Sequence, residues 1–460
     1  MIRQSIIKAL QKIVGKENLL TQKEDMLTYS YDAAVLNPVI PAAAVIPENT
    51  EALGKIIALC HENRIPVTVR GSGTNLSGGT IPETSGIVVL TSRLNKIIEI
   101  NEADMYAVVE PGVVTANLAA QVEKMGLFYP PDPGSMAVST LGGNVAENAG
   151  GLRGLKYGVT KDYVMGMGFF DCQGNHIKTG SKTVKCATGY NLTGLMVGSE
   201  GTLGILDRII LKLIPAPKAR VAMVAVYNTI EQASETVAGI ISARILPATL
   251  EILDNFTIRA VENYSKAGLP KDAGALLLIE VDGHPAVVGE EAEQIKALCL
   301  KMGADTIEQA ENEAQRDRIW AARRSALSAL AQLKPTLILE DATVPRSRIP
   351  DMVSAIQTIA NKYKIDIGTF GHAGDGNLHP TILTDRRNKE EFKRVENAIE
   401  EIFDTALAMG GTLSGEHGTG FAKAPFLEKE AGYSSIIFSR RLRAALDPHN
   451  ILNPGKITGA

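Results

Sequence analysis

The sequence predicts an α+β protein of two domains, and three observations lead to this prediction. Between residues 42 and 215, short apolar runs alternate with glycine-rich segments. Two prolines within three residues, in IPAPKAR beginning at Ile214, indicate a domain boundary. Beyond that boundary, helical patterns again alternate with strand patterns. A chain of 460 residues can bury such cores without disulfides or metals, so a bound metal is expected to have a chemical role.

Residues 1–40 are predicted to form an N-terminal helical segment. The stretch MIRQSIIKALQKIVGKENLL is apolar at a helical period, and Lys8, Lys12 and Lys16 interrupt it. This pattern is typical of an amphipathic surface helix and not of a signal sequence. No apolar run reaches the roughly 18 residues of a membrane span. A cytoplasmic location is therefore expected.

The first domain is predicted to cover residues 41–215. Strand patterns occupy residues 42–47, 65–73, 85–90 and 105–112. Helix patterns occupy residues 50–63 and 115–126, and Thr50 is expected to be the N-cap of the first. This mixture of short strands and helices gives the α+β class.

The second domain is predicted to cover residues 216–410. Strand patterns at residues 221–228 and 274–283 accompany a helix pattern at 229–243, and one long helix is expected over 311–333. Residues 411–460 begin with a glycine-rich loop and end in the turn-rich stretch ALDPHNILNPGKI. This C-terminal segment is predicted to fold back onto the first domain.

Charge and cysteine content exclude two classes of protein. The chain has 47 basic and 51 acidic residues and a net charge of −4, which argues against binding to nucleic acid through its phosphates. No C-x-x-C spacing occurs, so neither an iron–sulfur cluster nor a structural zinc site is predicted. The cysteines are scattered along the chain, at Cys60, Cys172, Cys186 and Cys299.

Three segments of the first domain gather glycines, hydroxyls and amides. VTVRGSGTNLSGG at residues 67–79 follows a strand pattern, and its backbone N–H groups and hydroxyls suit a phosphate or pyrophosphate. Its spacing matches neither the Walker A pattern nor the G-x-G-x-x-G fingerprint. Residues 130–151 and 198–205 have similar compositions. A shared site for a flat ring system is one interpretation, and three unrelated loops are the other.

The stretch TFGHAGDGNLHP at residues 369–380 places His372 and His379 around a glycine-rich turn. On one straight strand these side chains would point to opposite faces. If the segment between them turns the chain, the imidazoles come close enough to share a metal ion. Glu416, in SGEHGTG, is a candidate third ligand. Such a set suits zinc, iron(II) or manganese, although histidines around turns also serve as ordinary hydrogen-bonding residues.

Several ordered motifs together resemble a known family. VRGSGTNLSGG, TLGGNVAENAGG and GSEGTLGI are similar to the FAD-binding domain of the vanillyl-alcohol oxidase type of flavoprotein. Within that group, the chain from about residue 27 to residue 456 resembles D-lactate dehydrogenases, the FAD subunit of glycolate oxidase and D-2-hydroxyglutarate dehydrogenases. The resemblance implies a two-part FAD-binding domain at residues 41–215, joined by the returning segment 411–460. It also implies that residues 216–410 form an α+β substrate (cap) domain with an antiparallel sheet.

The resemblance also implies the site residues. His372, His379 and Glu416 match the metal ligands of the family, His417 its catalytic base, and Arg323 its substrate arginine, with Arg324 as a close competitor. Thr74 and Asn75 stand where some members carry a histidine that tethers the flavin, so the FAD is expected to be non-covalent. The implied FAD-binding residues are Arg70, Gly71, Ser72, Gly73, Thr74, Asn75, Pro133, Gly134, Ser135, Thr140, Gly143, Asn144, Glu200, Gly204, Ile205 and Asn453.

These parts suggest oxidation of a 2-hydroxy acid to a 2-oxo acid. A divalent ion that holds the substrate hydroxyl lowers its pKa, His417 takes the proton, and the hydride moves to flavin N5. Apolar or small residues stand where relatives that accept a second carboxylate have polar ones, which favours a small acid such as D-lactate or glycolate. These positions are Leu327, Leu339, Pro380 and Thr381.

Reduced FAD must pass its electrons on, and the sequence contains no second redox motif. A partner protein is therefore expected, either an electron-transferring flavoprotein or the iron–sulfur subunit of a glycolate oxidase. Some relatives belong to an electron-bifurcating lactate dehydrogenase complex, and the chain is a candidate for that role. Two other classes of function are a flavin-free metallohydrolase and a nucleotide-binding scaffold without catalysis.

Overall fold

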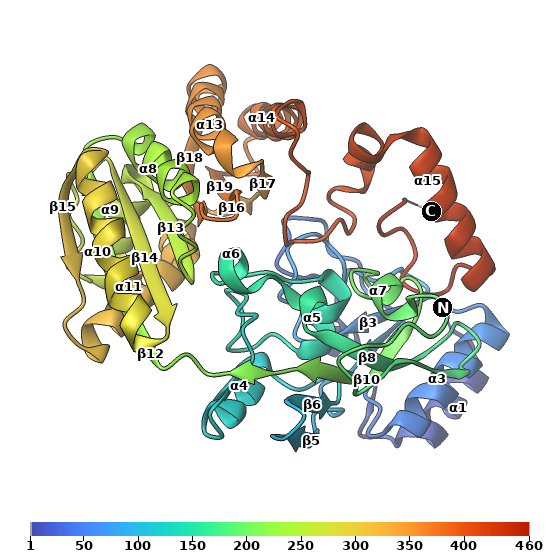
Figure 1. Cartoon of the computed structure of the whole chain (residues 1–460). Helices are drawn as coiled ribbons and strands as arrows, with labels where there is room; N and C mark the ends of the chain where they lie inside the picture. Colours follow the sequence, from blue (N-terminus) through green and yellow to red (C-terminus); the bar gives the residue numbers. More distant parts are fainter. Residues whose placement is uncertain (1, 460) are drawn as a thin grey trace. The chain divides into compact units, whose positions relative to one another are not determined.

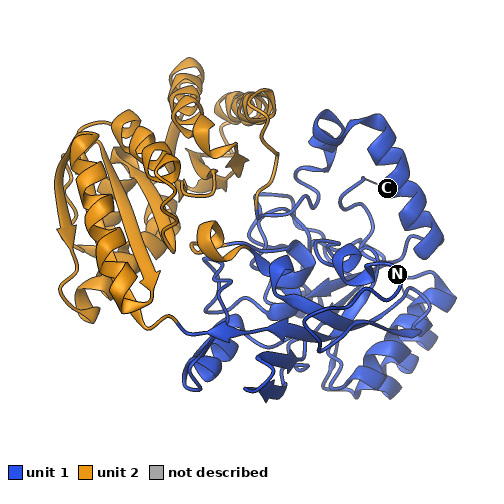
Figure 2. Ribbon diagram, viewed as in Figure 1, with its two compact units in different colours: residues 1–150, 159–216, 416–460 blue, residues 151–158, 217–415 orange. Residues whose placement is uncertain are grey.

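The computed structural model describes residues 2–459 and divides into two compact units (Figure 2). Unit 1 consists of Met1–Gly150, Val159–Ala216 and Glu416–Ala460, and unit 2 consists of Gly151–Gly158 and Pro217–Gly415. The division differs from the predicted boundaries in residues 151–158 and 411–415, which belong to unit 2, and in Ala216, which belongs to unit 1. Among residues 2–459, no helix combines the length and the apolar character that a membrane span requires.

A small sheet, mostly parallel, forms the first part of unit 1. Its strands run in the order β1-β2-β4-β3. The three parallel strands are mostly alanine, valine, isoleucine and leucine, and they are buried except for Val69 in β3; Thr68 and Arg70 are their two polar residues. Helices α1 and α3 pack against them. The bounds are β1 Leu19–Leu20, β2 Ala43–Val45, β3 Val67–Arg70, β4 Ile87–Leu90, α1 Gln4–Val14, α2 Lys23–Leu27 and α3 Thr50–Asn63.

The N-cap of α3 is Asn49, so the prediction of Thr50 was wrong by one residue. The Asn49 side chain accepts a hydrogen bond from the Ala52 amide over 2.9 Å. Thr50 is already helical, and its hydroxyl donates to Asp207 over 3.3 Å. Both residue types can cap a helix, and Asn49, the residue before the first helical position, does so here.

The second sheet of unit 1 is antiparallel and runs in the order β5-β6-β10-β8-β9. Buried and more exposed positions alternate along β10, which fits a strand with one face on a core. Helices α4, α5 and α7 supply further residues of that core or its border. The bounds are β5 Ile97–Asn101, β6 Tyr106–Val109, β8 Val164–Phe170, β9 His176–Gly180, β10 Ile205–Lys212, α4 Thr115–Glu123, α5 Leu141–Glu147 and α7 Leu192–Met196; β7 Leu127–Phe128 pairs with β11 Ile214–Pro215 outside this sheet.

The C-terminal segment of unit 1 lies beside β3. Leu452 bridges Val67 in parallel, and the Val67 amide donates to the carbonyl of Ile451 over 2.7 Å. Arg443, near the end of α15 (Leu427–Leu446), donates to the Leu452 carbonyl over 2.9 Å. The tail thus pairs with the first sheet and is fixed by the helix that precedes it.

Unit 2 is built on one antiparallel sheet, as the sequence predicts. The strands run in the order β15-β12-β14-β13-β18-β19-β16, and β17 pairs with β19 (Figure 1). Helices α8, α10, α13 and α14 cover one face, and α9, α11 and α12 cover the other. Both faces are apolar because both are covered, and β14 is accordingly buried at every position before its last residue.

The strands of unit 2 are β12 Ala219–Tyr227, β13 Thr249–Asp254, β14 Ala275–Gly283, β15 Ala304–Gln309, β16 Thr336–Leu339, β17 Ala342–Thr343, β18 Asp366–His372 and β19 Asn377–Thr384. The helices are α6 Gly154–Tyr157, α8 Ile230–Ser242, α9 Asn255–Ser265, α10 Pro285–Lys301, α11 Glu313–Arg324, α12 Ala326–Ala331, α13 Ile349–Tyr363 and α14 Lys389–Ala408.

The long helix predicted over residues 311–333 is divided at Ser325. Helix α11 ends at Arg324, and α12 begins at Ala326. The Ser325 hydroxyl donates to the Ala322 carbonyl over 2.7 Å, so it takes an acceptor that the helix backbone could use. The apolar pattern continues through this point, which is why periodicity alone did not reveal the break.

Asp254 at the end of β13 is expected to make the stability of the protein depend on pH. Its carboxylate accepts from the amides of Thr257 and Thr369 over 2.8 and 2.7 Å. Burial raises the pKa of Asp254 from 3.8 to about 6. Between these values the folded protein keeps a proton that the unfolded chain releases, so the free energy of unfolding falls as the pH rises through this window.

We expect Asp254→Asn to remove this pH dependence. The effect amounts to at most about 3 kcal/mol across the window. The Tm of the variant minus the Tm of the parent should therefore be more positive at about pH 7 than at about pH 4. Thermal unfolding at both pH values checks this, and an equal difference at the two values would contradict it.

Candidate functional site

The histidine pair lies on one β-hairpin of unit 2. His372 ends β18 opposite Asn377, and His379 in β19 lies opposite Phe370. The two histidines are therefore diagonal neighbours on the same face of the sheet, and not directly opposed residues. Their ring centroids are 5.0 Å apart, with the rings at 89° to each other. Both side chains are buried.

The turn of this hairpin requires glycine at position 376. Gly376 has φ +95°, and a Cβ atom there would lie 2.1 Å from the carbonyl oxygen of Val344. Neither the backbone angle nor the space permits another residue without a shift of the chain. The segment AGDG thus turns the chain and brings His372 and His379 together.

Glu251 joins the first histidine to the candidate substrate arginine. It lies in β13, which pairs with β18, and its side chain is fully buried. Its Oε1 is 2.6 Å from Nδ1 of His372. Its Oε2 accepts from Nε of Arg323 over 2.6 Å and lies 2.6 Å from Nη2. Burial acts to raise the pKa of Glu251, but the charge of Arg323 and the hydrogen bonds with Arg323 and His372 outweigh it and lower that pKa.

Arg323 is buried, whereas the neighbouring Arg324 is exposed. The guanidinium of Arg323 lies over the ring of Phe370, with its central carbon 4.6 Å from the ring centroid. Phe370 also lies 5.7 Å from the ring of His379. Of the two arginines, Arg323 is therefore the one that lies beside the histidine pair.

Asp341 lies beside the second histidine. Its carboxylate is fully buried, and Oδ1 is 3.9 Å from Nδ1 of His379. Oδ2 accepts from the hydroxyl of Ser414 over 2.9 Å, and Asn377 donates to Oδ1. Each histidine of the pair thus has its own buried carboxylate.

Sequence reasoning missed both Glu251 and Asp341. Glu251 stands in TLEILD, where all the other positions of the strand before the last are buried and apolar or uncharged. A charged residue within such a strand is rarely left without partners, and this was the available signal. Asp341 comes two residues after the apolar strand TLIL and offered a similar signal.

In unit 1, the three glycine-rich segments lie next to one another. The Ser72 hydroxyl donates to the carbonyl of Val138. The Glu200 amide donates to the carbonyl of Ala146 over 2.9 Å. The segments at residues 67–79, 130–151 and 198–205 therefore form one continuous surface of backbone, and not three separate loops.

The first of these segments needs its glycines for close packing. A Cβ atom on Gly71 would lie 2.2 Å from the hydroxyl of Thr140, and one on Gly73 would lie 2.1 Å from the guanidinium of Arg70. Nη1 of Arg70 donates to the carbonyl of Tyr31 over 2.6 Å. The side chain of Arg70 thus packs against the loop, while residues 71–76 stay partly exposed.

Other candidate cofactor residues make polar contacts within unit 1. Nδ2 of Asn75 donates to Asp32 over 2.6 Å, and Nδ2 of Asn144 donates to the hydroxyl of Thr115 over 2.8 Å. The side chain of Ile205 is buried in the core at the start of β10. At these positions the backbone is left as the part that could meet a cofactor. The loop positions are Thr74, Pro133, Gly134, Ser135 and Gly204, and Gly143 lies in the first turn of α5.

Glu200 fixes the loop that carries His417. Its carboxylate accepts from the amides of Thr419 and Gly420 over 2.6 and 2.7 Å. Burial raises the pKa of Glu200 to about 6, although these two amides oppose the shift. The side chain of His417 is largely buried, and its Nε2 lies 3.8 Å from Oε1 of Glu416.

A second carboxyl and the tail complete this part of unit 1. Gly418 has φ +79°, and a Cβ atom on it would lie 1.9 Å from Oε2 of Glu147. Burial raises the pKa of Glu147 well above its usual value, and the charge of Glu200 adds to the effect. Nδ2 of Asn453 donates to the carbonyls of Gly79 and Glu200 over 2.8 and 2.6 Å. The tail thus ties the first glycine segment to the third.

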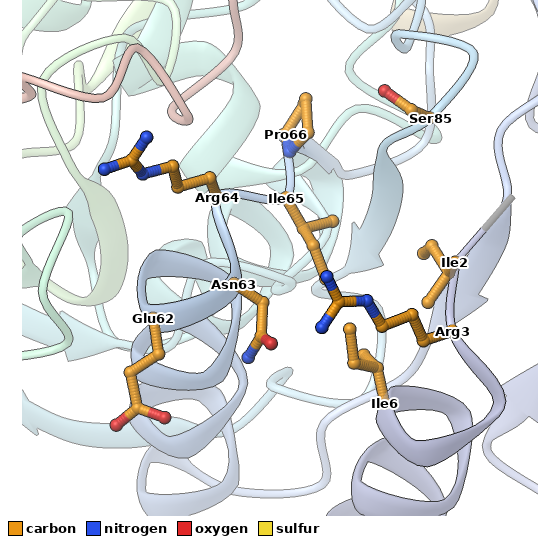
Figure 3. A pocket seen from close by; sticks show the side chains of 9 residues that line it. All are labelled: Ile2, Arg3, Ile6, Glu62, Asn63, Arg64, Ile65, Pro66 and Ser85. Carbon is orange, nitrogen blue, oxygen red and sulfur yellow. The ribbon is translucent and has the colours of Figure 1, made fainter.

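A cavity of about 320 Å³ lies elsewhere in unit 1, between α1 and the end of α3. Figure 3 shows the side chain of Arg3 extending between Asn63 and Ile65, while Arg64 extends away. None of the candidate site residues lines this cavity, so it is separate from the candidate site. The lining residues are Ile2, Arg3, Ile6, Glu62, Asn63, Arg64, Ile65, Pro66 and Ser85.

Comparisons with known proteins cover both units. Residues 41–180 match the family described as FAD binding domain, and residues 216–457 match the C-terminal domain of FAD linked oxidases. The glycolate oxidase subunit GlcD of Bacillus subtilis is 51% identical over 457 residues, which cover 99% of this chain and 97% of that protein. A D-lactate dehydrogenase of Anaerostipes hadrus is 34% identical, with 97% and 96% covered.

Among solved structures, p-cresol methylhydroxylase with substrate bound gives a TM-score of 0.82 over 99% of this chain and 98% of that one. A 4-ethylphenol oxidase from Gulosibacter chungangensis gives 0.80 over 99% and 97%. Both are 18% identical to this chain, so they speak for the fold alone.

Proposed function

This chain belongs to the FAD-linked oxidases, and we propose that it oxidises a small D-2-hydroxy acid to the 2-oxo acid with FAD and a divalent metal ion. The family membership establishes an FAD-linked oxidoreductase related to glycolate oxidase subunits and D-lactate dehydrogenases, with the fold of vanillyl-alcohol oxidase-type flavoproteins. The single observation that carries the proposal is the buried chain of contacts from Arg323 through Glu251 to His372, beside His379.

The histidine pair fits a divalent metal. Nδ1 of His372 is engaged by a carboxylate, which is the usual arrangement for a histidine that binds a metal through Nε2. We assign Glu416 as the third ligand. Glu416 is two residues after Ser414, whose hydroxyl is bonded to Asp341 beside His379. The Cα atoms of Ser414 and Glu416 can therefore be no more than about 8 Å apart. Two imidazoles and a carboxylate suit zinc, iron(II) or manganese.

The surface formed by the three glycine-rich segments fits FAD. Residues 71–76 and 134–138 are partly or fully exposed, and no atom beyond the chain neighbours of Gly134 lies within 4 Å of the position of a Cβ on it. Backbone N–H groups next to glycines suit a pyrophosphate and the edge of a flavin. Thr74 and Asn75 offer no histidine for a covalent link at this loop, so the cofactor is held without one.

Two side chains of this chain act on the substrate. Arg323 pairs with the substrate carboxylate, because its guanidinium is fixed in position and always charged. His417 takes the proton of the substrate hydroxyl, since a neutral imidazole is a suitable base near pH 7. When bound, FAD supplies the hydride acceptor and the metal lowers the pKa of the hydroxyl.

The substrate is a small acid. Leu327 and Leu339 pack against the apolar cluster that includes Phe370, and Thr381 is fully buried. These residues offer no positive charge for a second carboxylate. D-lactate is favoured by the D-lactate dehydrogenase relative, and glycolate, favoured by the more similar GlcD relative, is the alternative. A flavin-free metallohydrolase would leave the FAD-binding domain without a role.

Electrons leave the reduced FAD through a partner protein. Among the described residues, Cys60 and Cys172 lie in one core of unit 1, Cys299 lies in the core of unit 2 and Cys186 is exposed, so the four cysteines do not form one cluster. An electron-transferring flavoprotein is the favoured partner, and the alternative is an iron–sulfur subunit, as a glycolate oxidase subunit would require. A place in an electron-bifurcating lactate dehydrogenase complex follows from the first choice.

Anaerobic titration of the purified flavoprotein tests the proposal. D-lactate, L-lactate, glycolate and D-2-hydroxyglutarate are added in turn, and the oxidised flavin band is followed. We expect D-lactate or glycolate to bleach the band, L-lactate to bleach it far less, and D-2-hydroxyglutarate to act weakly. Absence of flavin, or no bleaching by any 2-hydroxy acid, would contradict the proposed function.

We expect His372→Ala to lower the metal content and the rate of flavin reduction together. Removing one of three protein ligands weakens a metal site, and the exposed His449 serves as the matched control, as His449→Ala. Elemental analysis and anaerobic reduction are measured on the same samples. Equal metal content in His372→Ala and the parent would refute the ligand assignment.

A further inference from the structure

We propose that Glu251 is a positioning residue that fixes His372 and Arg323 at once, so that metal binding and substrate binding depend on one buried carboxylate. The proposal rests on the proposed function for its catalytic meaning. Its geometric content concerns only unit 2, because all three residues belong to that unit.

The two oxygens of Glu251 serve different partners. Oε1 meets Nδ1 of His372, and Oε2 meets Nε and Nη2 of Arg323, each contact at 2.6 Å. Glu251 can therefore hold His372 and Arg323 at the same time. The side chain of Glu251 is fully buried within β13, and those of His372 and Arg323 are 9% and 8% exposed, so water does not compete for these contacts.

The contact to His372 selects one form of the imidazole. A carboxylate accepts a hydrogen bond, so Nδ1 of His372 carries the proton and Nε2 keeps its lone pair. Nε2 is then the atom able to bind a metal, and the carboxylate also makes it a stronger base. Without Glu251 the ring could carry its proton on either nitrogen and rotate.

The contact to Arg323 selects one edge of the guanidinium. Nε and Nη2 are held by Glu251, and the flat face lies over Phe370. The remaining donors, on Nη1 and the outer side of Nη2, form the edge that matches a carboxylate with two parallel hydrogen bonds. Glu251 thus determines where a substrate carboxylate sits relative to His372.

A purely structural role explains this arrangement less well. A buried ion pair is often no more stabilising than apolar residues of the same size, and β13 is otherwise apolar around Glu251. An ion pair that also engages a histidine of the candidate metal site has a use that packing does not supply.

Glu251→Gln is the test, and Glu280→Gln is its matched control. Gln keeps the size of the side chain but has one acceptor oxygen in place of two, so it cannot serve both partners equally. Glu280 is also buried in the sheet of unit 2, and its Oε2 accepts from Nε1 of Trp320 over 2.8 Å. Glu280 thus bonds the same helix as Arg323 without engaging His372.

The readout is the affinity of the chelator-treated flavoprotein for Zn²⁺, measured by competition with a metal indicator. We expect Glu251→Gln to weaken binding by about 10–100-fold, as loss of a group that orients a ligand does, and Glu280→Gln to leave it unchanged. Anaerobic reduction of the flavin by the 2-hydroxy acid should also show a raised KM in Glu251→Gln, because Arg323 is no longer held in position. Equal Zn²⁺ affinity of Glu251→Gln and the parent would overturn the proposal.

A second measurement leaves Glu251 unchanged. The parent protein is labelled with ¹⁵N-histidine, and the signals of His372 are those that disappear in His372→Gln. Their nitrogen chemical shifts report which ring nitrogen carries the proton. A proton on Nδ1 supports the proposal, and a proton on Nε2 overturns it. If no 2-hydroxy acid bleaches the flavin while both results hold, the proposed function fails and the positioning role of Glu251 stands.

Discussion

His417→Ala is expected to keep its FAD and to lose reduction of that FAD by substrate, by a factor of about 10²–10⁴. The proton of the substrate hydroxyl then has no base to accept it. The fold of the loop should survive, because Glu200 binds the amides of Thr419 and Gly420 and not the imidazole. Anaerobic stopped-flow reduction by D-lactate or glycolate measures the loss, and the flavin content of the purified variant checks the cofactor.

His176→Ala is the control for this experiment. His176 is also in unit 1, where Nε2 lies 2.9 Å from Asp207, and it is not a candidate site residue. The FAD of His176→Ala should be reduced by the substrate at the same rate as the FAD of the parent. Undiminished reduction in His417→Ala would remove this residue from the reaction.

Arg323→Met is expected to have the largest effect on stability. Met preserves the length of the side chain and the contact with Phe370 but leaves Glu251 with one partner in a buried site. Breaking a buried pair in this way costs roughly 3–5 kcal/mol. Arg324→Met, at the exposed neighbour, should stay within about 0.5 kcal/mol of the parent. Thermal and denaturant unfolding of the two variants measures the difference.

The double variant Arg323→Met, Glu251→Leu separates stability from binding. Replacing both members of a buried pair by apolar residues is often neutral or stabilising, so much of the lost stability should return. Reduction by the 2-hydroxy acid should remain impaired, because no guanidinium is left for its carboxylate. Full recovery of substrate reduction in the double variant would contradict the role of Arg323.

The elements with strong local signals were predictable from the sequence. The glycine-rich stretch AGDG indicated a turn, and Gly376 in it has φ +95°. The hairpin that joins His372 to His379 could therefore be inferred before its register was known. Short apolar runs gave β2, β3, β4 and β14, and the apolar period of residues 4–14 gave α1. The α+β class and the antiparallel sheet of the second domain followed from these patterns and from the resemblance, and both are confirmed.

What depends on partners distant in sequence was not predictable. Glu251 is separated from His372 by 121 positions and from Arg323 by 72. The pairing of β13 with β18 brings His372 to Glu251, and the packing of α11 against the sheet brings Arg323. The Asn49 cap was missed because the adjacent Thr50 is also a capping residue type, and only the structure shows that Thr50 bonds Asp207 instead. Residues 151–158 belong to unit 2, where Leu155 packs in the core of that unit. No local sequence pattern indicates this packing.

The most direct test of the account compares the same flavoprotein before and after removal of its metal. The enzyme is treated with a chelator, divided, and one half is reloaded with Zn²⁺ or Mn²⁺; both halves then meet D-lactate and glycolate without oxygen. We expect slow flavin reduction in the stripped half and fast reduction in the reloaded half, with equal reduction of both by dithionite. Equal rates of reduction by the 2-hydroxy acid in the two halves would contradict a metal ion that binds the substrate beside the flavin.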